Sequence, residues 1–220
     1  MNPTRSIVFD KPENLKRSIA KQMQVNYSDD LFEIVPQPLY YKRNQAAAAI
    51  PTGFLEFFNF PVGQGTLGSG PGGVNTLWDT NIRQPNQIES GVFWIINSIQ
   101  MYALAPLSVQ DLQLMYGTFK ANWKLSIIDK DVLEIPFELI PNGIGYSTTA
   151  DDTATTPAVS TRPAWNGLAV MAEWSFEPQN LLLSPLKTFR IGLEVYQGYT
   201  PPTTFRWCMV LNGNKIRIAT

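Results

Sequence analysis

The stretch FKANWKLSII, residues 119–128, alternates between apolar and polar side chains. Its apolar positions are every second residue from Phe119 to Ile127, with lysine, asparagine and serine between them. A period of two indicates a β-strand with one buried face, because successive side chains of a strand point to opposite sides. Asp129 to Asp131 then turn the chain, and VLEIPFELIP runs back with Pro136 marking an edge or a bulge. The stretch therefore predicts a β-hairpin that packs against a core.

Further apolar runs predict that most of the chain is β-structure. The run VFWIINSIQMYAL, residues 92–104, is rich in β-branched and aromatic residues, although it is long for a strand. The pair Asn212-Gly213 predicts a tight turn between the last two strands. With about eight strands and no strand–helix–strand alternation, we expect an all-β fold, an antiparallel jelly-roll β-sandwich. A chain of 220 residues suits one such domain, a single jelly roll rather than two.

Residues 10–24, DKPENLKRSIAKQMQ, predict an amphipathic helix. Asp10 and Glu13 form a D-x-x-E capping box, and Leu15, Ile19 and Met23 recur on one face. We therefore divide the chain into an N-terminal basic amphipathic arm, residues 1–30, and a jelly-roll β-sandwich domain, residues 31–220. The arm either docks on its own domain, reaches a neighbouring subunit, or lies on an anionic membrane or nucleic acid. Its candidate contact residues are Arg5, Lys11, Lys16, Arg17 and Lys21.

Two other segments stand out between the predicted strands. SVQDLQLMYG, residues 108–117, predicts one short internal helix with Ser108 as its cap and Gly117 at its end. Residues 142–167 form a long polar loop, and a loop of this length in a compact domain usually has a function.

The sequence GQGTLG, residues 63–68, matches the glycine pattern of dinucleotide-binding loops. In those loops the glycines open a helix whose N-terminus faces the pyrophosphate. Here SGPGG follows, and glycine and proline disfavour a helix by about 1 and 3 kcal/mol per position. We expect instead a flexible glycine loop between two strands, exposed or packed against a neighbour.

The chain offers few groups for catalysis. It contains no histidine, which removes the commonest general base and the commonest zinc ligand. Its one cysteine, Cys208, is expected to be a small core residue. The pairs Asp129/Asp131 and Asp151/Asp152 are interpreted as turn and loop charges. We predict that the protein is not an enzyme, and we expect no metal, cofactor or small-molecule substrate.

Charge is sparse. Charged residues make up 16% of the chain, against about 25% in typical proteins. The formal net charge is −1. A surface of this kind suits burial between subunits, where an unpaired charge is costly. No apolar run approaches the roughly 18 residues of a membrane span, and the N-terminus lacks the hydrophobic segment of a secretory signal.

Three stretches together resemble the coat proteins of tailless icosahedral bacteriophages with jelly-roll capsids. They are DTNIRQPNQIESGVFWIINSIQMYA (79–103), FKANWKLSIIDKDVLEIPFELIPNGIG (119–145) and FEPQNLLLSPLKTFRIGLEV (176–195). The chain is shorter than the double jelly-roll coats of such viruses, which favours a single jelly roll or a minor coat or vertex protein. The resemblance implies a structural virion protein that self-assembles into a capsid and is made in the host cytoplasm. Its partners would be its own copies, other virion proteins and, through the arm, an internal membrane or the genome.

Two other functions stay open from the sequence. A carbohydrate-binding β-sandwich, such as a lectin or a receptor-binding spike, would use Trp78 and Trp165, which are predicted to lie in loops. The other four tryptophans fall in predicted strands and are expected in the core. A glycosidase would need two carboxylates facing each other across a cleft, for which Glu173 and Glu194 are the candidates.

Overall fold

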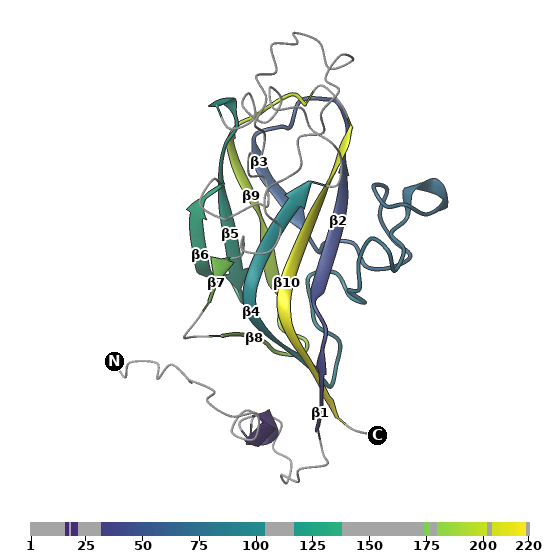
Figure 1. Cartoon of the computed structure of the whole chain (residues 1–220), viewed down its shortest axis with the longest axis vertical. Coiled ribbons are helices and arrows are strands. Elements are labelled where there is room, and N and C mark those ends of the chain that lie inside the picture. The colour runs from purple at the N-terminus through teal and green to yellow at the C-terminus, as the bar shows by residue number, and fades with distance from the viewer. Residues whose placement is uncertain are drawn as a thin grey trace, which may run out of the picture.

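Two antiparallel β-sheets that share one apolar core make up most of the part of the chain that the structure describes (Figure 1). The computed structural model describes residues 16, 17, 19–21, 32–103, 117–137, 174–176, 180–201 and 204–218. Every pair of neighbouring strands among them is antiparallel. For these residues the prediction of antiparallel sheets in an all-β fold is therefore confirmed.

Each sheet has four strand positions side by side, although two positions of sheet A are each filled by two short strands. Sheet A contains β1 (Phe32–Pro36), β2 (Leu39–Gln45), β4 (Val92–Ala103), β7 (Trp174–Ser175), β8 (Leu181–Leu183) and β10 (Phe205–Ile218). Sheet B contains β3 (Gly53–Phe57), β5 (Lys120–Ile127), β6 (Lys130–Pro136) and β9 (Phe189–Gln197) in the order β3–β9–β5–β6. In sheet A, β1 and β2 follow one another along one side of β10, and β7 and β8 do the same along β4. Its order is thus β1/β2–β10–β4–β7/β8.

The core between the sheets follows from the alternation that the sequence displays. In β5, Ala121, Trp123 and Leu125 are buried, whereas the polar residues between them are not. Phe137, which follows β6, meets Trp207 of β10 edge-on with 6.1 Å between the ring centroids. Three of the four tryptophans expected in the core are buried, and Trp174 packs against them partly buried. Burial of such large aromatic surfaces is the main contribution to stability.

The predicted turn at Asn212-Gly213 is wrong, because β10 runs through it without a break. β10 pairs with β4 on both sides of this step, and the register shifts there so that Asn97 has no opposite residue. This irregularity is a β-bulge in β4. A Cβ atom on Gly213 would lie 1.8 Å from the carbonyl oxygen of Ile95. The glycine therefore permits a close approach of two strands rather than a hairpin.

The bulge also reverses which side chains of β4 point into the core. Before it the even-numbered residues lie in the core between the sheets, and after it the odd-numbered ones do. Phe93 and Ile95 consequently lie on the outer face of sheet A, where they belong to a separate apolar cluster. The bulge thus explains why this strand is long and apolar on both faces.

Part of the predicted N-terminal helix covers this outer cluster. Residues 16, 17 and 19–21 are helical, and Ile19 and Ala20 are buried. They pack with four residues of sheet A: Phe32, Phe93, Ile95 and Ile216. Of the alternatives for this segment, these contacts are those of a helix that docks on its own domain.

Several predictions concern residues outside the described ranges. They include Arg5 and Lys11 of the arm, the loop 142–167, and all of the internal helix except Gly117, which is helical. Of the arm residues that are described, Lys16 is partly buried, whereas Arg17 and Lys21 are exposed. In the described ranges, no helix has the length and apolar character needed to cross a membrane.

We expect the substitution Ile19→Asp to release the N-terminal helix from sheet A, because a buried carboxylate without a partner is costly. Phe93 and Ile95 would then be open to water. Stronger fluorescence of an apolar dye should report this exposure. Lys21→Asp changes an exposed position of the same helix and serves as the control. Equal dye binding by the two variants would contradict the docking.

We expect Gly213→Ala to lower the free energy of unfolding by about 1–3 kcal/mol, the usual cost of forcing an extra methyl group into a packed site. Urea unfolding followed by tryptophan fluorescence measures this loss. Gly117→Ala is the matched control, because a Cβ atom there meets nothing within 4 Å. A Gly213→Ala protein as stable as the control would show that β4 and β10 do not approach so closely.

Candidate functional site

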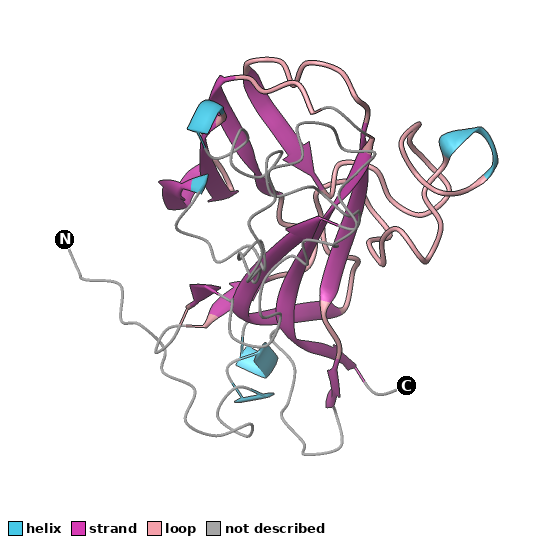
Figure 2. Cartoon of the chain, turned by 45° about the horizontal axis from the view of Figure 1, so that its top comes forward, coloured by secondary structure: helices cyan, strands magenta, loops and turns pink. Residues whose placement is uncertain are grey.

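The segment between β3 and β4, residues 58–91, projects from one side of the sandwich, and we call it the lobe (Figure 1). Figure 2 shows it as loop apart from the single 3₁₀ turn η2 (Pro71–Gly73). The lobe lies along the edge of β2, where Tyr41 forms a bridge with Thr80. The Lys42 amide donates to the Asp79 carbonyl at 2.6 Å, and the Thr80 hydroxyl donates to the Tyr40 carbonyl at 2.9 Å. The lobe thereby covers a strand edge that would otherwise invite pairing with another chain.

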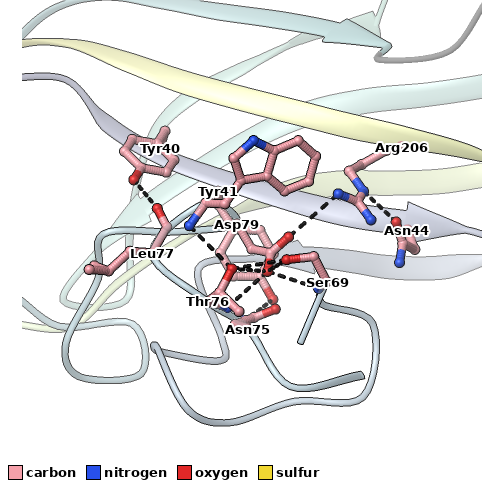
Figure 3. A network of polar contacts seen from close by, with 10 residues as sticks. Tyr40, Tyr41, Asn44, Ser69, Asn75, Thr76, Leu77, Asp79 and Arg206 are labelled. Atoms are coloured by element: carbon pink, nitrogen blue, oxygen red, sulfur yellow. Dashed lines mark hydrogen bonds and ion pairs between the residues drawn. The ribbon is translucent and has the colours of Figure 1, made fainter. Parts of the chain in front are cut away.

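Asp79 holds the lobe together from its centre (Figure 3). Its side chain is 1% exposed. The oxygen Oδ2 accepts hydrogen bonds from the amide and hydroxyl of Ser69, at 2.8 and 2.6 Å, and from those of Thr76, at 2.8 and 2.9 Å. The other oxygen, Oδ1, lies 3.6 Å from Nη1 of Arg206 on β10. Asp79 therefore joins two turns of the lobe to sheet A.

The charge on Asp79 depends on these donors. Burial by itself would raise the pKa of the carboxyl group, since it disfavours the charged form. The hydrogen bonds from Ser69 and Thr76 outweigh burial and hold the pKa of Asp79 below its ordinary value. The group is consequently an ionised carboxylate at neutral pH.

The glycine-rich part of the lobe is a closed turn. The Gly68 amide donates to the Gly73 carbonyl at 2.6 Å, and the Gly70 amide donates to the Val74 carbonyl at 2.9 Å. At Gly73, where φ is +81°, a Cβ atom would lie 2.4 Å from the carbonyl oxygen of Thr66. Only glycine permits this packing of backbone on backbone. The segment therefore differs from the flexible connection expected from the sequence. The expectation that no dinucleotide-type helix follows the glycines is confirmed, because η2 is a single turn.

A second set of polar contacts fixes the base of the lobe. The buried Asn75 donates from Nδ2 to the Phe60 carbonyl at 2.7 Å, and the Tyr41 hydroxyl donates to Oδ1 of Asn59 at 3.1 Å. The ring of Tyr41 packs on Phe58 with 5.4 Å between centroids, and burial raises the pKa of its phenol. The lobe is thus held both at its base and at its centre.

Trp78 lies on the surface of the lobe against two cations from sheet A. It is 54% exposed, in agreement with the prediction of an exposed loop aromatic. Nζ of Lys42 lies 3.6 Å and Cζ of Arg206 lies 4.5 Å from the centre of its ring. A cation–π contact at an exposed site contributes about 0.5–1 kcal/mol. Arg206 therefore binds the lobe twice, through Asp79 and through Trp78.

Residues 58–82 of the lobe expose several large apolar side chains. Four large side chains are between 39 and 56% exposed: Phe60, Leu67, Leu77 and Trp78. Asp79 is the only charged residue between Glu56 and Arg83, and it is buried. Clustered apolar side chains on the surface of a folded protein mark an interaction site. The exposed apolar side chains of residues 58–82 are the candidate functional site, and the exposed Arg83 follows this stretch.

Of the acidic residues considered from the sequence, Asp131 and Glu194 belong to surface ion pairs, and Asp129 is exposed in the turn between β5 and β6. Asp131 lies 3.1 Å from Nζ of Lys124 and accepts a hydrogen bond from Ser126, and Glu194 lies 3.8 Å from the same lysine. Asp151, Asp152, Glu173 and Trp165 lie outside the described residues. Within the described ranges, no three acidic or cysteine side chains lie close enough together to hold a metal ion.

The sequence analysis did not single out Asp79, Lys42 or Arg206. The available signal was the isolation of Asp79 in a long uncharged segment, since a lone charge there needs a partner. Its partner Arg206 is far away in the sequence, and only the pairing of β10 with β2 brings the two together.

Comparison with protein-family models, curated proteins and solved structures finds no match to this chain. Function therefore rests on the fold and on the lobe.

We expect Asp79→Ala to lower the free energy of unfolding by about 3 kcal/mol, since it removes one partner of a buried charge pair and leaves four donors without their acceptor. Urea unfolding measures the loss. Asp131→Ala is the matched control, because Asp131 also pairs with a serine and a cation but is 50% exposed. Its removal should cost much less than that of Asp79, because exposed ion pairs contribute little to stability. Equal losses for the two variants would contradict the role of Asp79.

The pH dependence of stability tests the charge itself. Because the pKa of Asp79 is lower in the folded protein than the usual value of about 3.9, the ionised form adds stability above that pH. This contribution is lost as the pH falls through the folded pKa. Asp79→Asn should therefore have a lower free energy of unfolding than the unsubstituted protein at neutral pH. This difference in the free energy of unfolding should narrow below about pH 4. A gap that stays constant with pH would show that shape and not charge is responsible.

Proposed function

We propose that this chain is a structural virion protein, a coat subunit that assembles with copies of itself. The observation that carries this proposal is the order of strands in the two sheets. Along the chain the strands alternate between the two sheets. The exceptions are three consecutive pairs that stay in one sheet, namely β1 and β2, β5 and β6, and β7 and β8. The last strand, β10, lies between β2 and β4 in sheet A.

This order supports a single jelly roll as the finer description of the fold. When β1 is counted with β2, and β7 with β8, eight strand positions remain, four in each sheet. Eight strands wound between two sheets are typical of jelly rolls, which occur in viral capsid proteins and in lectins. The resemblance of three stretches within residues 79–195 to coat proteins of tailless icosahedral bacteriophages supports a viral capsid protein over a lectin.

The lobe supports a function in assembly, because a fold by itself does not determine function. A coat subunit needs surfaces that fit its neighbours rather than a reactive group. The cores of protein interfaces are poor in charged residues, and residues 58–82 of the lobe expose large apolar side chains but no charged side chain of their own. The exposed Arg17 and Lys21 of the N-terminal helix are the proposed contact to another virion component, such as a second protein, an internal membrane or the genome.

A carbohydrate-binding module is the second candidate, and the exposure of Trp78 favours it. Tryptophan rings that are open to water stack on sugar rings. Here Lys42 and Arg206 already contact the ring, and the adjacent Leu77 is apolar. Binding on a glycan array that is lost in Trp78→Ala would support this function over assembly.

Sedimentation velocity with negative-stain imaging, across protein concentration and salt, tests the proposed function. We expect trimers, pentamers or shell fragments that grow with concentration. The apolar lobe predicts contacts that persist in high salt, because salt screens charge–charge contacts but not apolar burial. A protein that stays monomeric at every concentration and salt would contradict the proposal.

A further inference from the structure

The large apolar side chains that remain exposed fall into two groups. Of the eight such side chains among the described residues, four lie on the lobe. Three others, Ile128, Val132 and Leu186, lie at the β5–β6 hairpin and at the turn before β9, and we call them the turn patch. The lobe projects from the side of the sandwich away from β6 in both views (Figures 1 and 2), whereas Leu186 lies beside the end of the lobe segment, where its amide meets the Ile88 carbonyl.

Two residues of the turn patch occupy backbone conformations that suit other residue types. Ile128 has φ of +49° and is 54% exposed, and Leu186 has φ of +59° and is 59% exposed. Glycine, asparagine and aspartate are the usual residues at such turn positions, and a β-branched residue there is an outlier. Asparagine would relieve the backbone and remove the exposed apolar surface at once. Neither folding nor solubility therefore accounts for these two side chains.

The turn patch is held in place by backbone hydrogen bonds. The Ile128 amide donates to the Thr188 carbonyl at 3.0 Å, which joins the two turns. The Leu186 amide donates to the Ile88 carbonyl at 2.9 Å, which joins the second turn to the end of the lobe segment. The lobe itself is held by the side chain of Asp79. Two surfaces that are ordered in advance lose little freedom when they bind.

Among the described residues no strand pairs with the outer edge of β6, and this edge is unsuited to pairing. The register between β5 and β6 shifts at Val132, which forms a bulge, and Pro136 has no amide hydrogen to donate. Bulges, prolines and charges such as Lys130 and Glu134 are the features by which proteins protect strand edges. Contacts at this side of the molecule must therefore be made by side chains.

We propose that the lobe of one copy docks on the turn patch of a second copy. The inference rests on the proposed self-assembly and names the surfaces that carry it. Residues 58–82 of the lobe expose no charged side chain of their own with which to recognise a lipid headgroup, a nucleic acid or an acidic protein, so the occupant of this stretch must offer apolar surface. The turn patch is the other group of exposed apolar side chains among the described residues.

The difference between the two surfaces determines the kind of assembly. Because the two surfaces differ and share no residue, each copy can use both at the same time. A head-to-tail contact of this kind repeats until a ring or a shell closes. A two-fold dimer, in which the same surface meets itself, would leave either the lobe or the turn patch exposed.

Two double variants test the contact. The lobe variant carries Leu67→Ser and Leu77→Ser, and the turn variant carries Ile128→Asn and Leu186→Asn, where asparagine tolerates the positive φ. Tyr196→Ser, which removes an exposed aromatic outside both groups, is the control. Near-UV circular dichroism checks that each variant is folded. In sedimentation velocity we expect each double variant to need at least tenfold more protein to assemble, while the control assembles like the unsubstituted protein.

Mixing the two double variants separates a head-to-tail contact from all others. The turn variant retains an intact lobe and the lobe variant retains an intact turn patch, so an equimolar mixture should form heterodimers and nothing larger. A mixture that stays monomeric would overturn the inference. Double variants that assemble like the control would also overturn it and leave the proposed function standing. If the unsubstituted protein itself never assembles, the proposed function and this inference fail together.

Discussion

The pairing of β4 with β10 is the interaction on which the rest of the structure depends. These two long strands form the centre of sheet A, and the other strands of the sheet pair with one or the other of them. Their inner faces supply much of the core, and their outer faces hold the cluster that Ile19 joins. Near its start, β10 carries Arg206, which reaches Asp79. The bulge at Asn97 allows β4 to contribute side chains to an apolar cluster on each face of sheet A.

The lobe shows how a chain with few charges uses a buried one. A long loop without strands loses much conformational freedom on folding, and the closed turns of the lobe supply only part of the compensation. Asp79 gathers four donors and one cation at a single point. Since burying a charge pair costs desolvation energy, its benefit is a defined conformation more than added stability. A defined conformation is what an apolar contact surface requires, because ordering it at the moment of binding would weaken the contact.

The sequence predicted those parts of the fold that depend on local pattern. The alternation in β5, the β5–β6 hairpin and the burial of Trp94, Trp123 and Trp207 follow from a period of two and from side-chain size. The prediction failed at Asn212-Gly213, because the same dipeptide suits a hairpin turn and a close approach at a bulge, and only the partner strand decides between them. The contact between Asp79 and Arg206 was not predicted for the same reason, since it depends on which strands lie side by side. The exposure of Ile128 and Leu186 is likewise invisible to a pattern that assigns apolar residues to the core.

A cryo-electron microscopy reconstruction of the largest species formed by the concentrated protein tests the central claim most directly. The account predicts a closed ring or shell in which every copy meets its neighbour through the same contact, with the lobe of one on the β5–β6 side of the next. Particles without a repeated contact, or a repeated contact that leaves both the lobe and the turn patch in water, would contradict it.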